Sequence, residues 1–286
     1  MLSPIFLIIG LPYFALSIAA EIYLVNKMRR RQRKEGSRNS LQGYENRDTF
    51  ASLSMGVISL IVGIFLGYGT LKLSLFSYGY KFISIPNKIV AWSLAMVGWD
   101  LVYYFYHRAS HRINILWANH VQHHSSQKYN LSTALRQPVT SFGEWLFFPF
   151  LCLLGLSPFQ VATAGAINLL YQFWIHTEIF KRLPGWFEAV FNTPSHHRVH
   201  HGSNGIYLDK NFGGILIVWD KLFSTFEKET ETVRYGLVHN IDSYNPITIT
   251  FHQYADIIGN IAKSKPKNLL GFLFMPPGWR PAYAAS

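Results

Sequence analysis

Residues 192–204 read NTPSHHRVHHGSN, a stretch that places four histidines within six positions. His197, His200 and His201 follow the pattern HxxHH, and His196 is an additional histidine directly before it. The spacing is neither that of an HExxH zinc protease nor that of a zinc finger. So dense a group of imidazoles predicts a metal site of another kind.

Histidines recur upstream, at the ends of apolar segments. His107 and His111 in HRASH are four residues apart, so on a helix both rings lie on one face and can hold one ion. This motif has no glutamate in second place, which excludes the HExxH protease. His176 follows another apolar segment in the stretch WIHTE.

The stretch HVQHH contains His120, His123 and His124 and has the same HxxHH spacing as the later group. On a helix, His120 lies above both later histidines, whereas His123 and His124 diverge by about 100°. Neighbours that point in different directions suit two different metal ions. A lone histidine beside an apolar face is more often structural, but so many at helical spacings predict a metal centre.

The available donor atoms narrow the choice of metal. Cys152 is the only cysteine and lies in an apolar run, so nitrogen and oxygen atoms must supply the ligands. So many imidazoles exceed what one or two closed structural zinc sites need. Imidazole also binds iron, copper and nickel, and two irons with open positions can activate O2. The predicted catalytic and metal-binding residues are His107, His111, His120, His123, His124, His176, His197, His200 and His201.

Three other residues are candidates for a second layer that orients these rings. Asp100 lies seven residues before His107 on the same helical face, and Glu178 lies two residues after His176. His196 has no counterpart in the HVQHH stretch, so we expect it to be a neighbour of the ligands rather than a ligand.

The composition indicates a lipid environment. The 286 residues are 49% hydrophobic and 16% aromatic, and only 14% are charged, against about 25% in an ordinary soluble domain. The net charge is +11, but the densest basic run, KMRRRQRK at 27–34, directly follows an apolar segment. We interpret this run as a membrane-orientation signal, and we expect no nucleic-acid partner.

Apolar segments predict about five transmembrane or hairpin helices. The segments cover residues 4–26, 51–71 and 89–106, followed by a hairpin over 142–175 that is interrupted at 155–158. The 27–50 loop carries eight Lys/Arg residues, so the positive-inside rule places it in the cytosol. Counting crossings from there places 107–141 and everything after 176 in a cytosolic cap. The active site is therefore expected on the cytosolic side.

The predicted fold is an all-α integral membrane protein whose cytosolic helical cap holds the histidine-rich di-iron site. Residues 1–88 form N-terminal membrane anchor helices with a basic cytosolic loop, 89–240 the catalytic domain, and 241–286 an interfacial C-terminal tail. Two charged residues, Glu21 near the end of the first segment and Arg136 after HVQHH, are expected to be interfacial.

The stretches HRASH, HVQHH and HHRVHH resemble the histidine boxes of the fatty acid hydroxylase/sterol desaturase superfamily of integral-membrane di-iron oxygenases. Longer strings, YNLSTALRQ at 129–137 and DKNFGGILIVWDKLFSTFE at 209–227, resemble its glyceryl-ether-cleaving members. The likeness extends over about residues 90–240 and is much more specific in these strings than in the boxes.

The resemblance implies an all-helical fold, two iron ions, O2 as oxidant and hydroxylation of the ether-linked carbon of an alkylglycerol lipid. It also implies tetrahydrobiopterin as electron donor. The sequence has no GxGxxG dinucleotide loop and no HPGG haem motif, so electrons must come from a separate reductant or reductase. The membrane of such an enzyme would be the bacterial inner membrane or the endoplasmic reticulum.

Two alternatives stay open at this point. The same irons could serve a sterol, sphingolipid or fatty-acyl hydroxylase or desaturase. From a different class, a membrane metal-binding or transport protein would also use clustered histidines, although a transporter should place ligands near the middle of the bilayer. Here they gather at the ends of the apolar segments.

Overall fold

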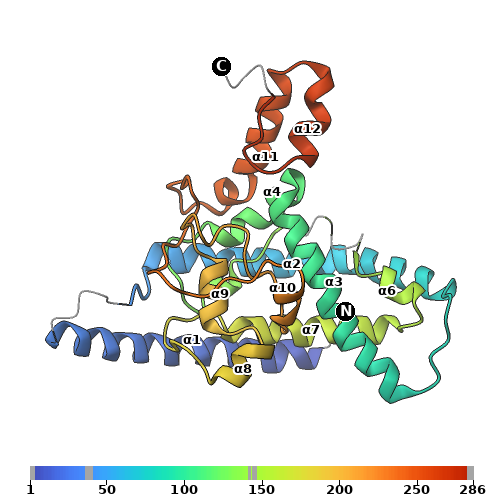
Figure 1. Ribbon diagram of the computed structural model, residues 1–286, viewed down its shortest axis with the longest axis horizontal. Coiled ribbons are helices and arrows are strands. Elements are labelled where there is room, and N and C mark those ends of the chain that lie inside the picture. The colour runs from blue at the N-terminus through green and yellow to red at the C-terminus, as the bar shows by residue number, and fades with distance from the viewer. Residues whose placement is uncertain (1–3, 36–40, 141–142, 144–146, 282–286) are drawn as a thin grey trace.

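The computed structural model describes residues 4–35, 41–140, 143 and 147–281, and its regular elements there are helices, apart from two isolated β-bridges (Figure 1). The prediction of an all-helical chain is confirmed. The longer helices are α1 (Pro4–Lys34), α2 (Asn46–Gly79), α3 (Lys88–Arg112), α4 (Asn114–His124), α7 (Pro158–Trp174) and α11 (Pro246–Ala262). The short ones are η1 (Thr133–Leu135), α6 (Phe150–Leu153), α8 (Gly185–Val190), α9 (Pro194–His200), α10 (Val218–Leu222), η2 (Pro266–Asn268) and α12 (Leu269–Phe274).

Two of the described helices, α2 and α3, are long and apolar enough to cross a membrane. Large apolar side chains such as Ile61, Ile64 and Phe65 on α2 lie exposed, as expected for a surface that faces lipid. The other crossings expected from the sequence stay predictions. The α1 helix continues through the basic run to Lys34, because Lys and Arg are good helix formers, so residues 27–34 are helix rather than loop.

The predicted hairpin over 142–175 breaks where the sequence indicated. Gly155 has φ +90, and a Cβ there would collide with the carbonyl oxygen of Ile83. Ser157 then begins α7 with a capping box to Gln160, and Pro158 occupies the first helical turn. The second arm is thus the 17-residue α7. The first arm lies partly outside the described residues and contains the short α6 in its described part.

The site rests on a core formed where α3 packs against α7. Ala95 and Trp99 of α3 contact Leu151, Val161 and Ala164 in a buried cluster. Gly165 permits this close approach, because a Cβ there would lie 3.0 Å from the Trp99 ring.

Glu21 is buried in the structure, and the expectation that it is interfacial is wrong. Its carboxylate accepts hydrogen bonds from the Leu131 amide at 2.7 Å and from the hydroxyls of Tyr44 and Thr177. Three donors compensate the cost of removing the carboxylate from water. Glu21 thereby fastens α1 to the residue next to His176.

Arg136 is also buried, which corrects the expectation that it is interfacial. Its guanidinium forms an ion pair with Asp48 at 2.7 Å and donates to the hydroxyls of Ser52 and Ser125 at 3.0 Å. Because these partners lie on α2 or directly after α4, Arg136 joins α2 to the segment that follows α4.

The C-terminal helices α11 and α12 project from the body beside α4 (Figure 1). Asn114 holds them, since its amide donates to the Met275 carbonyl at 3.1 Å and its side chain to the Phe272 carbonyl at 2.9 Å. Ile258, Leu270 and Phe274 leave apolar surface exposed on this hairpin. The location of this tail on the membrane surface stays a prediction.

We expect Glu21→Ala to destabilise the folded protein by about 1–3 kcal/mol, because the replacement leaves buried donors unsatisfied. The matched control is Glu35→Ala, directly after the end of the same helix, which removes only an exposed ion pair with Arg31. Thermal unfolding of both variants in the same detergent measures the difference. Equal melting temperatures for the two variants would contradict this role of Glu21.

Candidate metal centre

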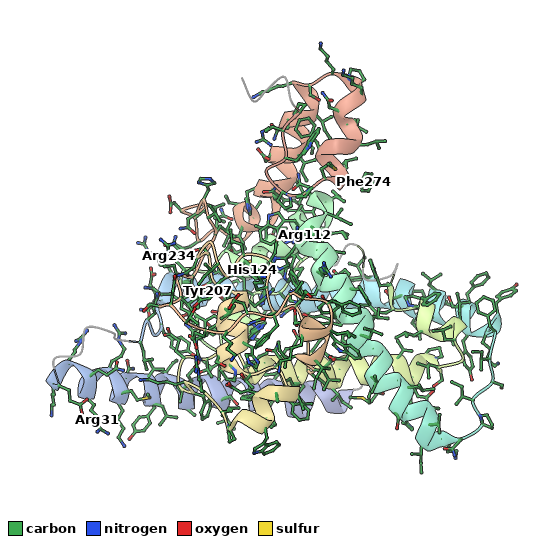
Figure 2. The ribbon with its side chains drawn as sticks, in the orientation of Figure 1. Arg31, Arg112, His124, Tyr207, Arg234 and Phe274 are labelled. Atoms are coloured by element: carbon green, nitrogen blue, oxygen red, sulfur yellow. The ribbon has the colours of Figure 1, made fainter. Side chains whose placement is uncertain are left out.

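The nine histidines predicted as ligands converge on the middle of the described structure in two groups. Within each group the ring nitrogens lie within 4.8 Å of one another. The first group contains His107, His111, His120, His124 and His200, and the second His123, His176, His197 and His201. Figure 2 shows His124 near the centre, Arg31 towards the far end of α1, and Phe274 at the base of the C-terminal hairpin beside α4.

The helices α4 and α9 each contribute histidines to both groups. On α4, His120 and His124 enter the first group while His123 enters the second. On α9 and directly after it, His200 belongs to the first group while His201 belongs to the second. The divergence expected for adjacent histidines on a helix is therefore confirmed.

Arg198 anchors α9 from the opposite face. Its guanidinium pairs with Glu229 at 2.6 Å and donates to the carbonyl oxygens of Thr177, Phe180 and Lys181. Four partners hold a helix of seven residues that is too short to be stable alone. This role of Arg198 could not be predicted from the sequence, which shows only a cation between histidines.

Backbone carbonyls fix the orientation of four rings. The Nδ1 atoms of His107, His123, His176 and His200 lie 2.8, 3.2, 2.7 and 2.9 Å from the carbonyl oxygens of Phe212, Arg136, Gln172 and Lys210. A neutral imidazole that donates from Nδ1 keeps a free lone pair on Nε2. The Nε2 atoms of these rings are therefore ready to bind a cation.

Asp100 and Glu178 do not hydrogen-bond to a histidine ring, so the expectation that they orient the rings directly is wrong. Asp100 accepts from the amides of Ile215 and Leu216 at 2.7 and 3.1 Å and from the Trp219 indole at 2.8 Å. Glu178 accepts from the Gln42 amide at 2.7 Å. Both carboxylates brace loops beside the site instead.

His196 lies outside both groups, as expected. Its ring packs against Phe226 at a centroid distance of 5.3 Å, and its carbonyl accepts from the Asn211 side chain at 3.0 Å. Burial lowers the pKa of His196 to about 4.

Asp220 is a supporting residue that the sequence did not reveal. It accepts from the amides of Phe212 and Gly213, both at 2.7 Å, and from the Thr225 hydroxyl at 2.7 Å. Burial raises its pKa to about 6. Asp220 fixes the turn whose Phe212 carbonyl orients His107. Directly before this turn, Asp209 and Asn211 have positive φ.

The contacts between rings show that the groups fit metal ions. The Nε2 atoms of His123 and His176 lie 3.2 Å apart, yet both rings place Nδ1 against a carbonyl, so neither neutral ring has a proton to share. The Nε2 atoms of His111, His200 and His201 are buried without a partner among the described residues. A cation in each group satisfies lone pairs that otherwise face one another.

The rings are in the protonation state that ligands need. Burial lowers the pKa of His123 to about 4, and it lowers the pKa values of His124, His176 and His200 well below their ordinary value. These imidazoles are neutral at pH 7 and offer lone pairs to a metal.

Comparison with known proteins agrees with this geometry. Residues 92–225 match the sequence model of the fatty acid hydroxylase family, a range that contains all nine histidines. The chain belongs to this family. No solved structure shows a significant match to the chain.

Among curated relatives of this fatty acid hydroxylase family member, human alkylglycerol monooxygenase is 43% identical over 240 residues, covering 82% of this chain and 53% of the relative. The Caenorhabditis elegans alkylglycerol monooxygenase is 33% identical over 263 residues, covering 84% and 51%. An ornithine lipid hydroxylase of Rhizobium tropici is 29% identical over 133 residues, covering 43% and 38%. The chain spans about half the length of the alkylglycerol monooxygenases it matches.

We expect the metal-free protein to lose stability as the pH falls below about 6.5, the ordinary histidine pKa, towards the value of about 4 that His123 has when folded. In this window the unfolded chain binds more protons than the folded one, so acid favours unfolding. Melting temperatures of chelator-treated protein at pH 7.5, 6 and 5 measure the effect. A melting temperature that is constant over this range would contradict it.

Proposed function

We propose that this protein is an O2-dependent di-iron lipid monooxygenase that hydroxylates the ether-linked carbon of an alkylglycerol lipid. The observation that carries the proposal is the pair of buried histidine groups, whose neutral rings present Nε2 lone pairs to one another. The similarity to alkylglycerol monooxygenases over 82% of the chain supports the choice of substrate.

In this proposal the first group holds one iron and the second group holds the other. Among the described residues, each group consists of histidines and offers four or five nitrogen donors. Imidazole donors suit iron, and iron supplies the redox chemistry that O2 activation needs. The protein keeps the donors neutral by burial and aims them with the carbonyls of Phe212, Arg136, Gln172 and Lys210.

Aromatic side chains connect the membrane helix α3 with the first group. The ring of Trp99 stacks on Phe148 and on Tyr103 at centroid distances of 4.6 and 5.5 Å, and Tyr103 lies 5.2 Å from His107. This apolar side suits an alkyl chain that approaches from lipid. The Tyr103 hydroxyl donates to Gln172 at 2.7 Å, which keeps it away from the apolar path.

The overall reaction requires an electron donor in addition to the lipid and O2. One oxygen atom of O2 enters the C–H bond, the other leaves as water, and two electrons and two protons are consumed. The hydroxylated ether carbon is a hemiacetal, which collapses to a fatty aldehyde and glycerol. We propose that a separate reductant or reductase supplies the electrons, with tetrahydrobiopterin as the donor that the resemblance favours.

The membrane arrangement belongs to the same proposal. The basic end of α1 and the loop that follows lie in the cytosol, and the histidine groups face the same side. The protein is then an integral membrane enzyme of a bacterial inner membrane or the endoplasmic reticulum with a cytosolic active site.

A hydroxylase of another lipid is the second candidate, favoured by the similarity to an ornithine lipid hydroxylase. The two candidates share the metal centre and differ in substrate. Incubation of membranes with alkylglycerol under O2, with lipid analysis of the products, separates them. Loss of the alkylglycerol with gain of a fatty aldehyde supports the first candidate, and a hydroxylated product of another lipid class supports the second.

We expect anaerobically loaded protein to bind about two irons per chain, because each group supplies a full set of donors. The double variant His176→Ala/His197→Ala removes half of the second group, so the stoichiometry should fall to about one. His111→Ala/His200→Ala should do the same through the first group. Elemental analysis at matched amounts of folded protein measures this. A wild-type stoichiometry of one or less contradicts the assignment.

We expect His200→Ala to lower lipid turnover by orders of magnitude, because it removes a donor from the first group. The matched control is His196→Ala in the same helix, which lies outside both groups and should cost at most about 10–100-fold. Turnover and iron content at equal membrane expression measure both. Equal loss of iron in the two variants would show that His196 is also a ligand.

A further inference from the structure

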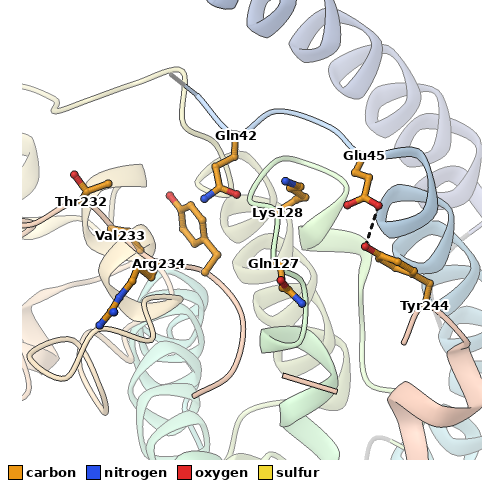
Figure 3. A pocket seen from close by; sticks show the side chains of 9 residues that line it. Gln42, Glu45, Gln127, Lys128, Thr232, Val233, Arg234 and Tyr244 are labelled. Atoms are coloured by element: carbon orange, nitrogen blue, oxygen red, sulfur yellow. Dashed lines mark hydrogen bonds between the residues drawn. The ribbon is translucent and has the colours of Figure 1, made fainter. Parts of the chain in front are cut away.

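Figure 3 shows a polar cavity of about 400 Å³, separated from the second histidine group by two tyrosines. It opens between the start of α2, the loop after α4 and the segment 232–235. Its lining includes Gln42, Glu45, Gln127, Lys128, Arg234 and Tyr235. The volume is in the range of small-molecule sites, and the lining combines two cations, a carboxylate and two amides.

Two stacked tyrosines connect this cavity to the second group. Tyr235 lines the cavity, and its ring stacks on Tyr129 at a centroid distance of 4.8 Å and an angle of 5°. Tyr129 in turn lies 5.7 Å from His176 and 5.2 Å from His201. Both tyrosines are buried, so the column excludes water between the cavity and the histidines.

Hydrogen bonds hold the column in register. The Tyr129 hydroxyl donates to the Ile175 carbonyl at 3.0 Å, and the Tyr235 hydroxyl donates to Glu178 at 3.4 Å. Ile175 directly precedes His176, so the stack is fixed to the backbone that carries a histidine of the second group. Parallel rings in contact give good electronic overlap, which favours electron transfer over such a distance.

The polar cavity and the apolar approach lie at different histidine groups. Trp99, Phe148 and Tyr103 lead to His107 of the first group, whereas the cavity adjoins the second. A lipid tail cannot satisfy a lining of charged and amide groups. The ligand that fits the cavity is therefore a water-soluble molecule rather than the lipid.

We propose that this cavity binds the external electron donor, a small polar organic reductant that loses two electrons and two protons, and that Tyr235 and Tyr129 conduct its electrons to the second group. Lys128 and Arg234 would face carbonyl or anionic oxygens of the donor, and Glu45 its amino groups. The substrate, O2 and the donor with its two electrons and two protons are converted into hydroxylated product, water and oxidised donor. This inference rests on the proposed function, since it needs a metal centre that consumes electrons.

Binding to the metal-free protein tests the site without iron chemistry. Tetrahydrobiopterin, titrated anaerobically by calorimetry, should bind the wild type. Lys128→Gln/Arg234→Gln should raise its Kd at least about tenfold, because two charge-assisted contacts are lost. The control Lys267→Gln removes an exposed cation of the C-terminal hairpin and should leave the Kd unchanged. Absence of binding, or an equal Kd in the double variant, overturns the site.

Anaerobic reduction of iron-loaded protein tests the column. Bleaching of the ferric absorption by saturating tetrahydrobiopterin should slow at least about tenfold in Tyr235→Leu, because the stacked ring is lost. Tyr235→Phe keeps the ring and should restore the rate. Tyr244→Leu changes a cavity residue outside the column and should leave the saturated rate unchanged. Equal saturated rates in Tyr235→Leu and wild type overturn the column.

These outcomes separate the inference from the proposed function. A wild type that binds the donor and is reduced through Tyr235, but yields no oxidised alkylglycerol, refutes the substrate while the donor site stands. Alkylglycerol oxidation with an unchanged KM for the donor in Lys128→Gln/Arg234→Gln refutes the donor site alone. Reduction by an electron-transfer protein in the absence of any small-molecule binding also overturns the inference.

Discussion

A neutral imidazole has two ring nitrogens and only one proton, and this constraint organises the centre of the molecule. Where Nδ1 donates to a backbone carbonyl, Nε2 is left with a lone pair that must find a partner. His123 and His176 both meet this condition and face each other at 3.2 Å. The arrangement is unfavourable for the protein alone and favourable once a cation lies between the rings.

The carbonyls that set the ring orientation are themselves held by buried charges. The Arg136 carbonyl accepts a hydrogen bond from His123, and the Arg136 guanidinium forms an ion pair with Asp48 on α2. The Phe212 carbonyl accepts a hydrogen bond from His107. Asp220 holds the turn around Phe212 by accepting from its amide, and Asp100 holds the residues that follow by accepting from the Ile215 amide. Charges that do not touch the histidines thus determine where the lone pairs point, so the protein can position donors on loops as firmly as on helices.

Helical periodicity made the histidines predictable from sequence. The i, i+4 pair of His107 and His111 and the HxxHH spacing of His120, His123 and His124 carry the geometry within single helices, and the structure places them accordingly. The break at 155–158 could also be predicted, because a glycine followed by a serine and a proline is a local signal that one helix ends and another begins.

Long-range polar contacts could not be predicted in this way. Glu21 and Arg136 were assigned to the interface because charged residues near apolar segments usually lie there, but their partners are far away in sequence. Asp100 lies on the same helical face as His107, yet it binds the loop amides of Ile215 and Leu216. Tertiary packing determines which donors a carboxylate binds. The periodicity of the sequence contains no information about that packing.

The division of histidines within α4 and α9 has a consequence for assembly. Because both helices supply rings to both groups, neither group can be put in order without fixing segments that the other also needs. In the proposed di-iron centre, an ion that enters one group would therefore lower the entropic cost of filling the other, so uptake at the two positions would be linked thermodynamically. Such linkage would favour passage from the empty to the doubly filled form with little accumulation of the singly filled form.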